Sequence, residues 1–160
     1  MQMKENEKAD DSLATVLVVD DNKQNLELLL AYLEDVDCRT VAAAGGVEAI
    51  DIVKQAPPDL ILLDVMMPKM SGFEVCKRLK NDTKTADIPI IMVTALNELG
   101  DIERAINCGT DDFLSKPVNK WELITRVRTM LKLKHLTDKL ERTLAYLNEV
   151  ESQVQPGRAQ

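Results

Sequence analysis

The chain has 160 residues, a formal net charge of −7, and 45% hydrophobic and 29% charged residues. This composition fits one folded domain with an extension, and no apolar stretch approaches the about 20 residues that cross a bilayer. The negative charge disfavours binding to nucleic acid, and we expect no membrane partner. Residues 1–13 lack the apolar segment of a secretory signal, which predicts a disordered leader on a cytoplasmic protein.

Five apolar segments of strand length alternate with segments of helical period. This order predicts an α/β fold built from βαβ units around a parallel sheet. Nearly continuous Val, Ile and Leu runs are typical of strands that helices cover on both faces. The expected strands are residues 15–19, 39–43, 59–63, 89–93 and 112–115.

The segments between these strands carry helix-boundary signals. Asn22 is a candidate N-cap for a helix over residues 22–34, whose leucines recur at helical spacing. Ser71, with Glu74 three residues later, matches the capping-box pattern at the start of another helix. Gly109 is expected to end the fourth helix in the left-handed conformation.

The last helix is expected to open near Asn119 and to continue without glycine or proline as far as Pro156. In its first part, we expect four apolar side chains to face the sheet: Trp121, Ile124, Val127 and Leu131.

The second part of this helix has a heptad pattern. Leu133, Leu140 and Leu147 lie seven residues apart, and apolar residues also occur between them at the spacing of a coiled-coil seam. We therefore expect a homodimer that forms a parallel coiled coil over residues 134–155, followed by a tail at 156–160. Leu144 leaves open a wider stripe, suited to a helix bundle or to a helix that folds back.

The three cysteines are widely spaced and include no C-x-x-C pair, and the chain has a single histidine. This pattern favours reduced thiols over a metal site. The residues are Cys38, Cys76 and Cys108.

Polar residues follow four of the predicted strands, at the ends that meet along one edge of a parallel sheet. Asp20 and Asp21 follow the first strand, and Asp64 follows the third. Adjacent carboxylates repel each other unless a cation lies between them, and Mg²⁺ prefers oxygen ligands of this kind. Taken alone, the Asp20-Asp21 pair is better explained as a turn before a helix, because such turn residues are common.

Asp64 follows an apolar strand, a position where a carboxylate is expected to be paired or reactive. A carboxylate can attack phosphorus and form an aspartyl phosphate. Lys116 could then neutralise the phosphoryl oxygens, and the Thr94 hydroxyl could donate to one of them. Each of these two residues also has an ordinary explanation, as a surface charge and as a helix cap.

Together, these residues and their flanking motifs resemble the receiver domain of two-component response regulators. The resemblance covers residues 14–133 and implies a flavodoxin-like, doubly wound sheet of five parallel strands in the order 2-1-3-4-5, with an extended C-terminal helix. The matching motifs are Val18-Val-Asp-Asp-Asn22, Leu63-Asp-Val-Met-Met-Pro-Lys-Met-Ser-Gly72, Met92-Val-Thr-Ala95 and Gly109-Thr-Asp-Asp-Phe-Leu-Ser-Lys-Pro117.

The resemblance also implies a role for each site residue. Asp64 would be the phosphoacceptor, and Thr94 and Lys116 would contact the phosphoryl oxygens. The ligands of Mg²⁺ would be Asp20, Asp21, Asp64 and the backbone carbonyl of Met66.

Two further positions match the loop after the fifth strand. Thr94 and Phe113 would be the switch residues, although Phe113 lacks the hydroxyl of the tyrosine more usual there. Pro117 would follow a cis peptide bond.

The resemblance implies a signalling module that receives a phosphoryl group from a sensor histidine kinase or a phosphotransfer protein. It would catalyse only its own phosphorylation and dephosphorylation, and would signal through dimerisation or a partner. One alternative is the regulatory N-terminal part of a larger regulator with a cyclase or phosphatase effector. Others are a haloacid-dehalogenase-like phosphatase, which would need an acid in place of Met66, and a flavodoxin-like scaffold that accepts no phosphoryl group.

Overall fold

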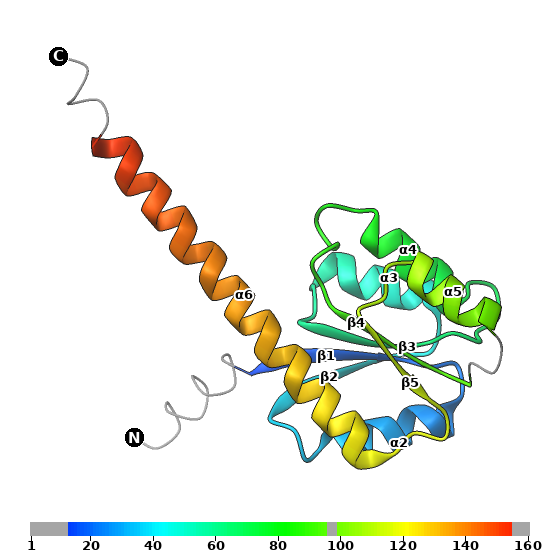
Figure 1. Ribbon diagram of the computed structural model, residues 1–160. Coiled ribbons are helices and arrows are strands. Elements are labelled where there is room, and N and C mark those ends of the chain that lie inside the picture. The colour runs from blue at the N-terminus through cyan, green and yellow to red at the C-terminus, as the bar shows by residue number, and fades with distance from the viewer. Residues whose placement is uncertain (1–12, 96–98, 155–160) are drawn as a thin grey trace.

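The computed structural model describes residues 13–95 and 99–154. Five parallel strands form one sheet in the order β2-β1-β3-β4-β5, with helices on both faces (Figure 1), as the sequence predicts. The strands are β1 (Ala14–Val19), β2 (Cys38–Ala43), β3 (Leu60–Asp64), β4 (Ile90–Thr94) and β5 (Asp112–Ser115). The helices are α2 (Lys23–Leu33), α3 (Gly46–Gln55), α4 (Gly72–Lys80), α5 (Leu99–Asn107) and α6 (Lys120–Val154).

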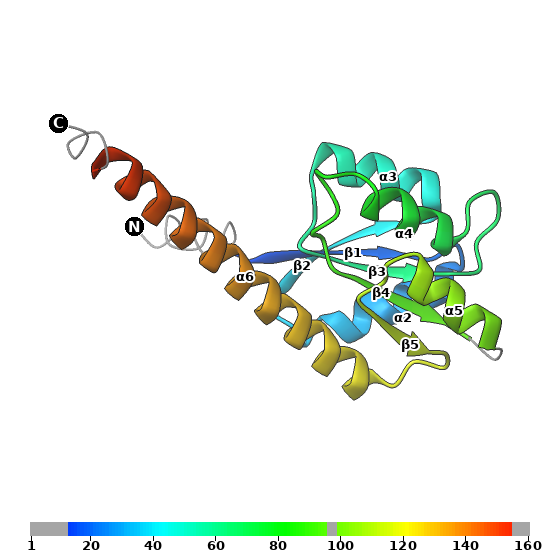
Figure 2. The same ribbon diagram turned by 45° about the horizontal axis from the view of Figure 1, so that its top comes forward.

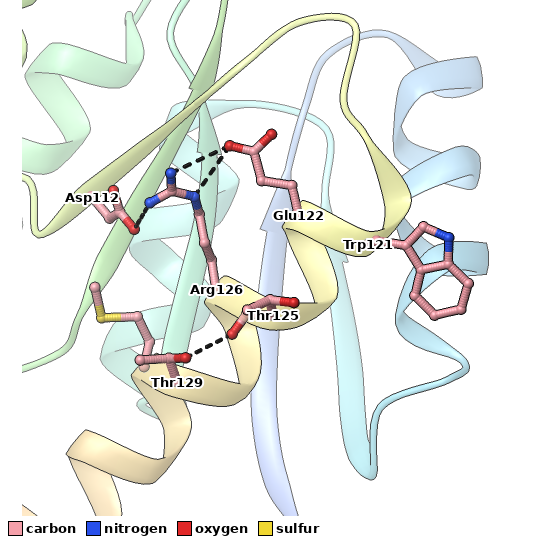
Figure 3. A pocket seen from close by; sticks show the side chains of 7 residues that line it. Asp112, Trp121, Glu122, Thr125, Arg126 and Thr129 are labelled. Carbon is pink, nitrogen blue, oxygen red and sulfur yellow. Dashed lines mark hydrogen bonds and ion pairs between the residues drawn. The ribbon is translucent and has the colours of Figure 1, made fainter.

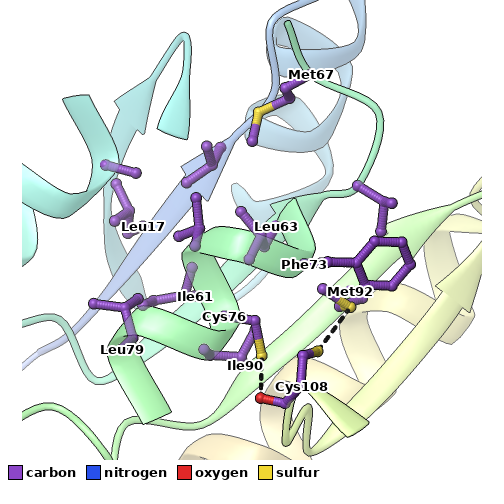
Figure 4. Close-up of a cluster of buried hydrophobic side chains, with 14 of the residues drawn as sticks. Leu17, Ile61, Leu63, Met67, Phe73, Cys76, Leu79, Ile90, Met92 and Cys108 are labelled. Carbon is purple, nitrogen blue, oxygen red and sulfur yellow. Dashed lines mark hydrogen bonds between the residues drawn. The ribbon is translucent and has the colours of Figure 1, made fainter. Parts of the chain in front are cut away.

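The sheet separates two hydrophobic cores. Alternate strand residues face opposite sides, so Ile61 and Leu63 pack under α3 and α4, whereas Leu60 and Leu62 pack against α2 and α6. Figure 4 shows the first core, where Phe73 and Met92 lie at one end. Every residue of β3 and β4 is buried, which explains why their sequences are continuous rather than alternating.

The helix ends follow the sequence signals. The Asn22 side chain accepts a hydrogen bond from the backbone N–H of Asn25 at 3.1 Å, and Ser71 accepts one from Glu74 at 3.3 Å. Gly109 has φ = +87°, the left-handed conformation that glycine adopts without steric cost. These local devices fix where α2 and α4 begin and where the chain turns after α5.

Burial on the first turns of α6 differs from the expectation in one residue. Trp121 is 69% exposed, whereas Leu123, Ile124 and Val127 are buried and Leu131 is partly buried. The expectation for Trp121 was therefore wrong. The buried stripe is centred on Val127, and Trp121 lies six residues away, about 120° around the helix.

The helix α6 continues well past the sheet (Figures 1 and 2). Its 35 residues span about 50 Å at 1.5 Å per residue. The heptad positions on this projecting part are exposed, with Leu133 at 53%, Leu140 at 59% and Leu147 at 50%. We call these residues, with Leu136, Val150 and Val154, the apolar stripe of α6.

Over residues 13–95 and 99–154, no helix combines the length and the apolar character needed to cross a membrane.

The cysteines carry free thiols, as the spacing predicts. Cys76 and Cys108 are buried in the first core, and the Cys76 thiol donates to the carbonyl of Cys108 at 3.2 Å (Figure 4). Burial raises the pKa of the Cys76 thiol, and the neighbouring Cys108 raises it further. A thiol of this kind packs as a small hydrophobic side chain.

Lys80 holds together the connection between α4 and β4. Its Nζ donates to the carbonyls of Ala86 at 3.1 Å and Ile88 at 2.8 Å and to the carboxylate of Asp111 at 2.8 Å, and its side chain is only 14% exposed. The same Asp111 oxygen accepts from the backbone N–H of Ile90. A single ammonium thus satisfies acceptors from two connections.

Replacing Lys80 by methionine should lower the free energy of unfolding by about 2 kcal/mol, because it leaves partly buried acceptors without a donor. Urea unfolding measures this. The matched control is Lys77→Met on the exposed face of the same helix, which should change stability by less than about 0.5 kcal/mol. Equal effects of the two substitutions would contradict the assigned role of Lys80.

Candidate functional site

The sheet brings the strand-end residues of the sequence prediction to one edge. Asp20 directly follows β1, Asp64 ends β3, Thr94 ends β4, and Lys116 directly follows β5. Because all five strands are parallel, these ends point the same way. In the register, Asp64 pairs with Val93, and Thr94 pairs with Ser115, so neighbouring strands end nearly level.

Three carboxylates gather at this edge. Asp20, Asp21 and Asp64 each offer an oxygen, and these oxygens all lie within 4.8 Å of one another. Asp20 is 1% exposed and Asp64 is 3% exposed, whereas Asp21 faces solvent. The backbone N–H of Asn22 donates to Asp20 at 2.8 Å, which orients that carboxylate. The cluster has the donor type, the charge and the spacing that suit a hard divalent cation such as Mg²⁺.

Burial of Asp64 has an electrostatic consequence. It raises the pKa of the Asp64 carboxyl above its ordinary value, and the Asp20 carboxylate raises it further. Hydrogen bonds from the Lys116 ammonium and from the backbone N–H of Met66 oppose this rise. The ionised form of Asp64 therefore carries an electrostatic cost that additional positive charge would reduce.

Lys116 supplies the cation of the site. Its Nζ lies 3.1 Å from Asp64 Oδ1 and 3.4 Å from Asp20 Oδ2. Burial lowers the pKa of Lys116, but the contacts with Asp64 and Asp20 outweigh it, so the pKa lies above its usual value. The backbone N–H of Lys116 donates to the carbonyl of Thr94 at 3.0 Å, and the Lys116–Pro117 bond is cis, as expected from the resemblance.

The remaining sequence-predicted residues differ in their burial. Thr94 is 3% exposed at the end of β4. Phe113 is 39% exposed on β5, three residues before Lys116. Met66 directs its backbone N–H to Asp64, while its side chain is 77% exposed. The structure thus brings Asp20, Asp21, Asp64 and Lys116 into one cluster and leaves Phe113 turned partly to solvent.

The loop after Asp64 is held by a close backbone approach at Gly72. The N–H of Gly72 donates to the carbonyl of Val65 at 2.9 Å. A Cβ on Gly72 would lie 2.2 Å from the carbonyl oxygen of Asp64 and 2.8 Å from Val65 Cα. Only glycine fits here, and its absent side chain sets the path of the chain directly after Asp64.

A cavity of about 520 Å³ adjoins the site and was not foreseen from the sequence. It lies between α2 and the connection from β5 to α6, and it reaches both Asp20 and Lys116. The sequence signal that could have indicated it is Leu28, an apolar residue outside the helical spacing of the buried leucines of α2; the structure leaves it 45% exposed on the cavity lining. The full lining is Asp20, Asn25, Leu28, Leu29, Tyr32, Val93, Lys116, Pro117 and Val118.

Comparison with known proteins shows to which family of sequences this chain is similar. The sequence pattern of the response regulator receiver domain matches residues 16–128. Among curated relatives, the response regulator PleD of Caulobacter vibrioides is 42% identical over 127 residues, which cover 79% of this chain and 28% of PleD. The DNA-binding dual master transcriptional regulator RpaA of Synechocystis sp. is 39% identical over 117 residues, which cover 73% of this chain and 48% of RpaA.

Solved structures agree. A CheY-like response regulator receiver domain protein from Methanospirillum hungatei superposes with a TM-score of 0.73 at 26% identity and covers 79% of this chain and 99% of that one. The chemotaxis response regulator CheY4 of Vibrio cholerae gives 0.70 at 29% identity and covers 74% and 99%.

The chain spans only part of these two curated relatives, 28% of PleD and 48% of RpaA. The match nevertheless includes every strand-end residue described above, from Asp20 to Lys116. The protein therefore belongs to the response regulator receiver domain family.

Proposed function

We propose that this receiver domain accepts a phosphoryl group on the carboxylate of Asp64, from a sensor histidine kinase or a phosphotransfer protein. The observation that carries the proposal is the position of Asp64. It is buried at a strand end, 3.1 Å from an ammonium and beside two further carboxylates. A carboxylate so placed is a fixed nucleophile: the ammonium can neutralise the oxygens of an incoming phosphoryl group, and the two further carboxylates could hold a divalent cation that does the same.

Each neighbouring side chain has a role in this step. Asp64 attacks phosphorus, and Lys116, already within 3.4 Å of two carboxylates, neutralises phosphoryl oxygens as charge develops on them. The Thr94 hydroxyl donates to another oxygen, and Thr94 and Phe113 change conformation when the group is in place. Receiver domains are generally signalling modules rather than enzymes, and we expect no catalysis beyond this domain's own phosphorylation and dephosphorylation.

The carboxylates of Asp20, Asp21 and Asp64 would hold Mg²⁺, with the backbone carbonyl of Met66 as a further ligand. Two observations support this fit: the mutual distance of at most 4.8 Å between the carboxylate oxygens, and the raised pKa of Asp64. A bound Mg²⁺ supplies positive charge that neutralises the phosphoryl oxygens.

Intact mass tests the proposal. Incubation with acetyl phosphate and Mg²⁺ should add one phosphoryl group to the protein, and Asp64→Ala should add none. A chain that gains no mass would refute the proposed function, and so would an Asp64→Ala variant that gains the same mass.

Removal of the metal should lower stability. A ligand that binds only the folded state stabilises it by about 2.7 kcal/mol at one hundred times its dissociation constant. The midpoint temperature of thermal unfolding should therefore rise as MgCl₂ is added and return to its initial value when EDTA removes the metal. Asp21→Ala should lose most of this response, whereas Asp51→Ala, an exposed aspartate on α3, should keep it. An undiminished response in Asp21→Ala would exclude Asp21 as a ligand.

We further propose that output passes through α6, by pairing of its apolar stripe with a second copy of the chain in a parallel coiled coil. The support is the exposure of Leu133, Leu140 and Leu147 on a helix that extends past the domain. An isolated helix would leave this stripe in water. A second copy repeats the same heptad spacing and can pack knobs into holes along it.

Two substitutions on the stripe should dissociate this dimer. Leu140→Asp with Leu147→Asp places four charges in the seam of a dimer, so sedimentation should show a monomer where the parent chain associates. Ala145→Asp, on the opposite face of the same turns, should leave association intact. A parent chain that sediments as a monomer at every concentration, with and without acetyl phosphate, would contradict pairing through α6.

A haloacid-dehalogenase-like phosphatase is not favoured. It requires a second acid two residues after the nucleophile, where this chain has Met66 with an exposed apolar side chain.

A further inference from the structure

Polar contacts join α6 to the rest of the domain at two places. At the end of α2, the Lys120 ammonium lies 2.7 Å from the carboxylate of Asp35, and Arg128 donates to the carbonyl of Asp35 at 2.9 Å. At the edge of the sheet, Nη1 of Arg126 lies 2.7 Å from Oδ2 of Asp112, the first residue of β5 (Figure 3). Within residues 13–95 and 99–154, this is the one side-chain ion pair that joins β5 to α6.

The two sets of contacts join α6 to different parts of the domain. Asp35 belongs to the connection after α2, away from the strand-end cluster. Asp112 begins the short strand whose next residue is Phe113 and which leads directly into Lys116. The other oxygen of Asp112 accepts from the backbone N–H of Phe113 at 2.8 Å. A shift of β5 caused by new contacts of Lys116 would therefore move Asp112, and with it the ion pair that joins Asp112 to Arg126 on α6.

Arg126 can leave Asp112 without losing all carboxylate contact. Its Nε and Nη2 each lie 3.3 Å from Oε1 of Glu122, one turn earlier on the same helix (Figure 3). The Arg126 side chain is 38% exposed, so water also satisfies a released guanidinium. An ion pair this exposed contributes little to stability, so Arg126 can release Asp112 at a small cost in free energy while Glu122 remains beside it.

The surroundings give the guanidinium room to move. The pair lies in a groove of about 480 Å³ on the outer side of α6 and β5, which Trp121, Thr125 and Thr129 also line. In Figure 3, the guanidinium lies between the carboxylates of Asp112 and Glu122, and the Trp121 ring extends from the first turn of the helix.

We propose that Asp112 and Arg126 form a positioning pair that transmits movement of β5 to α6, so that phosphorylation of Asp64 changes the orientation of the long helix. The inference rests on the proposed function, since it concerns the output of that phosphorylation. The helix α6 pivots about its buried residues Leu123, Ile124 and Val127, which remain packed on the sheet. The ion pair determines which orientation of the helix is favoured.

The chain contains its own reporter for this movement. Trp121 is the single tryptophan, lies on the first turn of α6 and is 69% exposed. Its fluorescence can be recorded on the full chain before and after addition of acetyl phosphate and Mg²⁺, with intact mass measured on the same samples. The parent chain should show a change in emission that follows the gain of the phosphoryl group.

Asp112→Asn keeps an acceptor for Phe113 but removes the charge that holds Arg126, and Arg126→Gln removes the other partner. Both variants should gain the phosphoryl mass and lose the change in Trp121 emission. The double variant should behave like either single one, because both break the same contact. The matched control is Glu122→Gln, which alters the other partner of Arg126 without touching β5 and should keep the change. Thermal unfolding checks that all four variants are folded.

Three outcomes would overturn the positioning pair: emission that does not change in a phosphorylated parent chain, a change that persists in Asp112→Asn, or an equal loss in Glu122→Gln. An absence of any phosphoryl mass in the parent chain would refute the proposed function instead, so the two failures are distinguishable.

Discussion

Lys116→Met is expected to slow phosphoryl transfer to the protein by about 10²- to 10³-fold, the usual effect of removing one preorganised donor from a site of developing charge. The Lys116 ammonium lies 3.1 Å from Oδ1 of Asp64 and 3.4 Å from Oδ2 of Asp20. Methionine keeps the length of the side chain but supplies no charge. The rate of mass gain with acetyl phosphate and Mg²⁺ measures the effect.

The control for this substitution is Lys69→Met. Lys69 is an exposed lysine in the loop between β3 and α4, so its loss removes the same charge from the protein without touching the cluster. The two variants should differ by at least about tenfold in rate. If they were phosphorylated equally fast, Lys116 would have no role beyond net charge.

Gly72→Ala is expected to have the largest effect on the architecture of the site. The added Cβ would meet the carbonyl oxygen of Asp64 at 2.2 Å, and the obstacle is backbone rather than a side chain that can move aside. We expect the free energy of unfolding to fall by about 3 kcal/mol, at the upper end of overpacking effects. Phosphoryl acceptance should fall with it, because relief of the clash displaces Asp64.

Gly100→Ala is the matched control for Gly72→Ala. No atom lies within 4 Å of a Cβ at Gly100, which is an exposed position in the first turn of α5. The substitution should raise stability by about 0.5 kcal/mol, because alanine restricts the unfolded chain more than glycine does. An equal loss of stability in both variants would mean that the contact with Asp64 is not the cause.

The residues of the site could be predicted from the sequence because their positions follow from the sheet. Asp20, Asp64 and Thr94 each come at the end of an apolar run, and parallel strands place such ends together whatever the details of packing. The strand order, in contrast, was predicted from the family resemblance and not from the position of these residues. Lys116 was a weaker prediction from its position alone, because a lysine after a four-residue strand could equally be a surface charge, and the family resemblance strengthened it.

Features that depend on how one element lies over another could not be predicted. The exposure of Trp121 is one, since apolar spacing alone does not show where on α6 the buried stripe is centred. The cavity beside α2 is another, because it needs the relative position of Leu28 and Pro117. The ion pair between Arg126 and Asp112 is a third. No sequence pattern connects these two residues, and they meet only because α6 packs against β5.

The proposed function requires that the carboxylate of Asp64 forms an acyl phosphate. Borohydride reduces an acyl phosphate of aspartate to homoserine and leaves free carboxylates unchanged, so it marks the modified residue permanently. After treatment with acetyl phosphate and Mg²⁺, then borohydride, peptide mass analysis should find homoserine at position 64 and aspartate at positions 20 and 21. Homoserine at another position, or phosphorylated protein that yields none, would contradict the account.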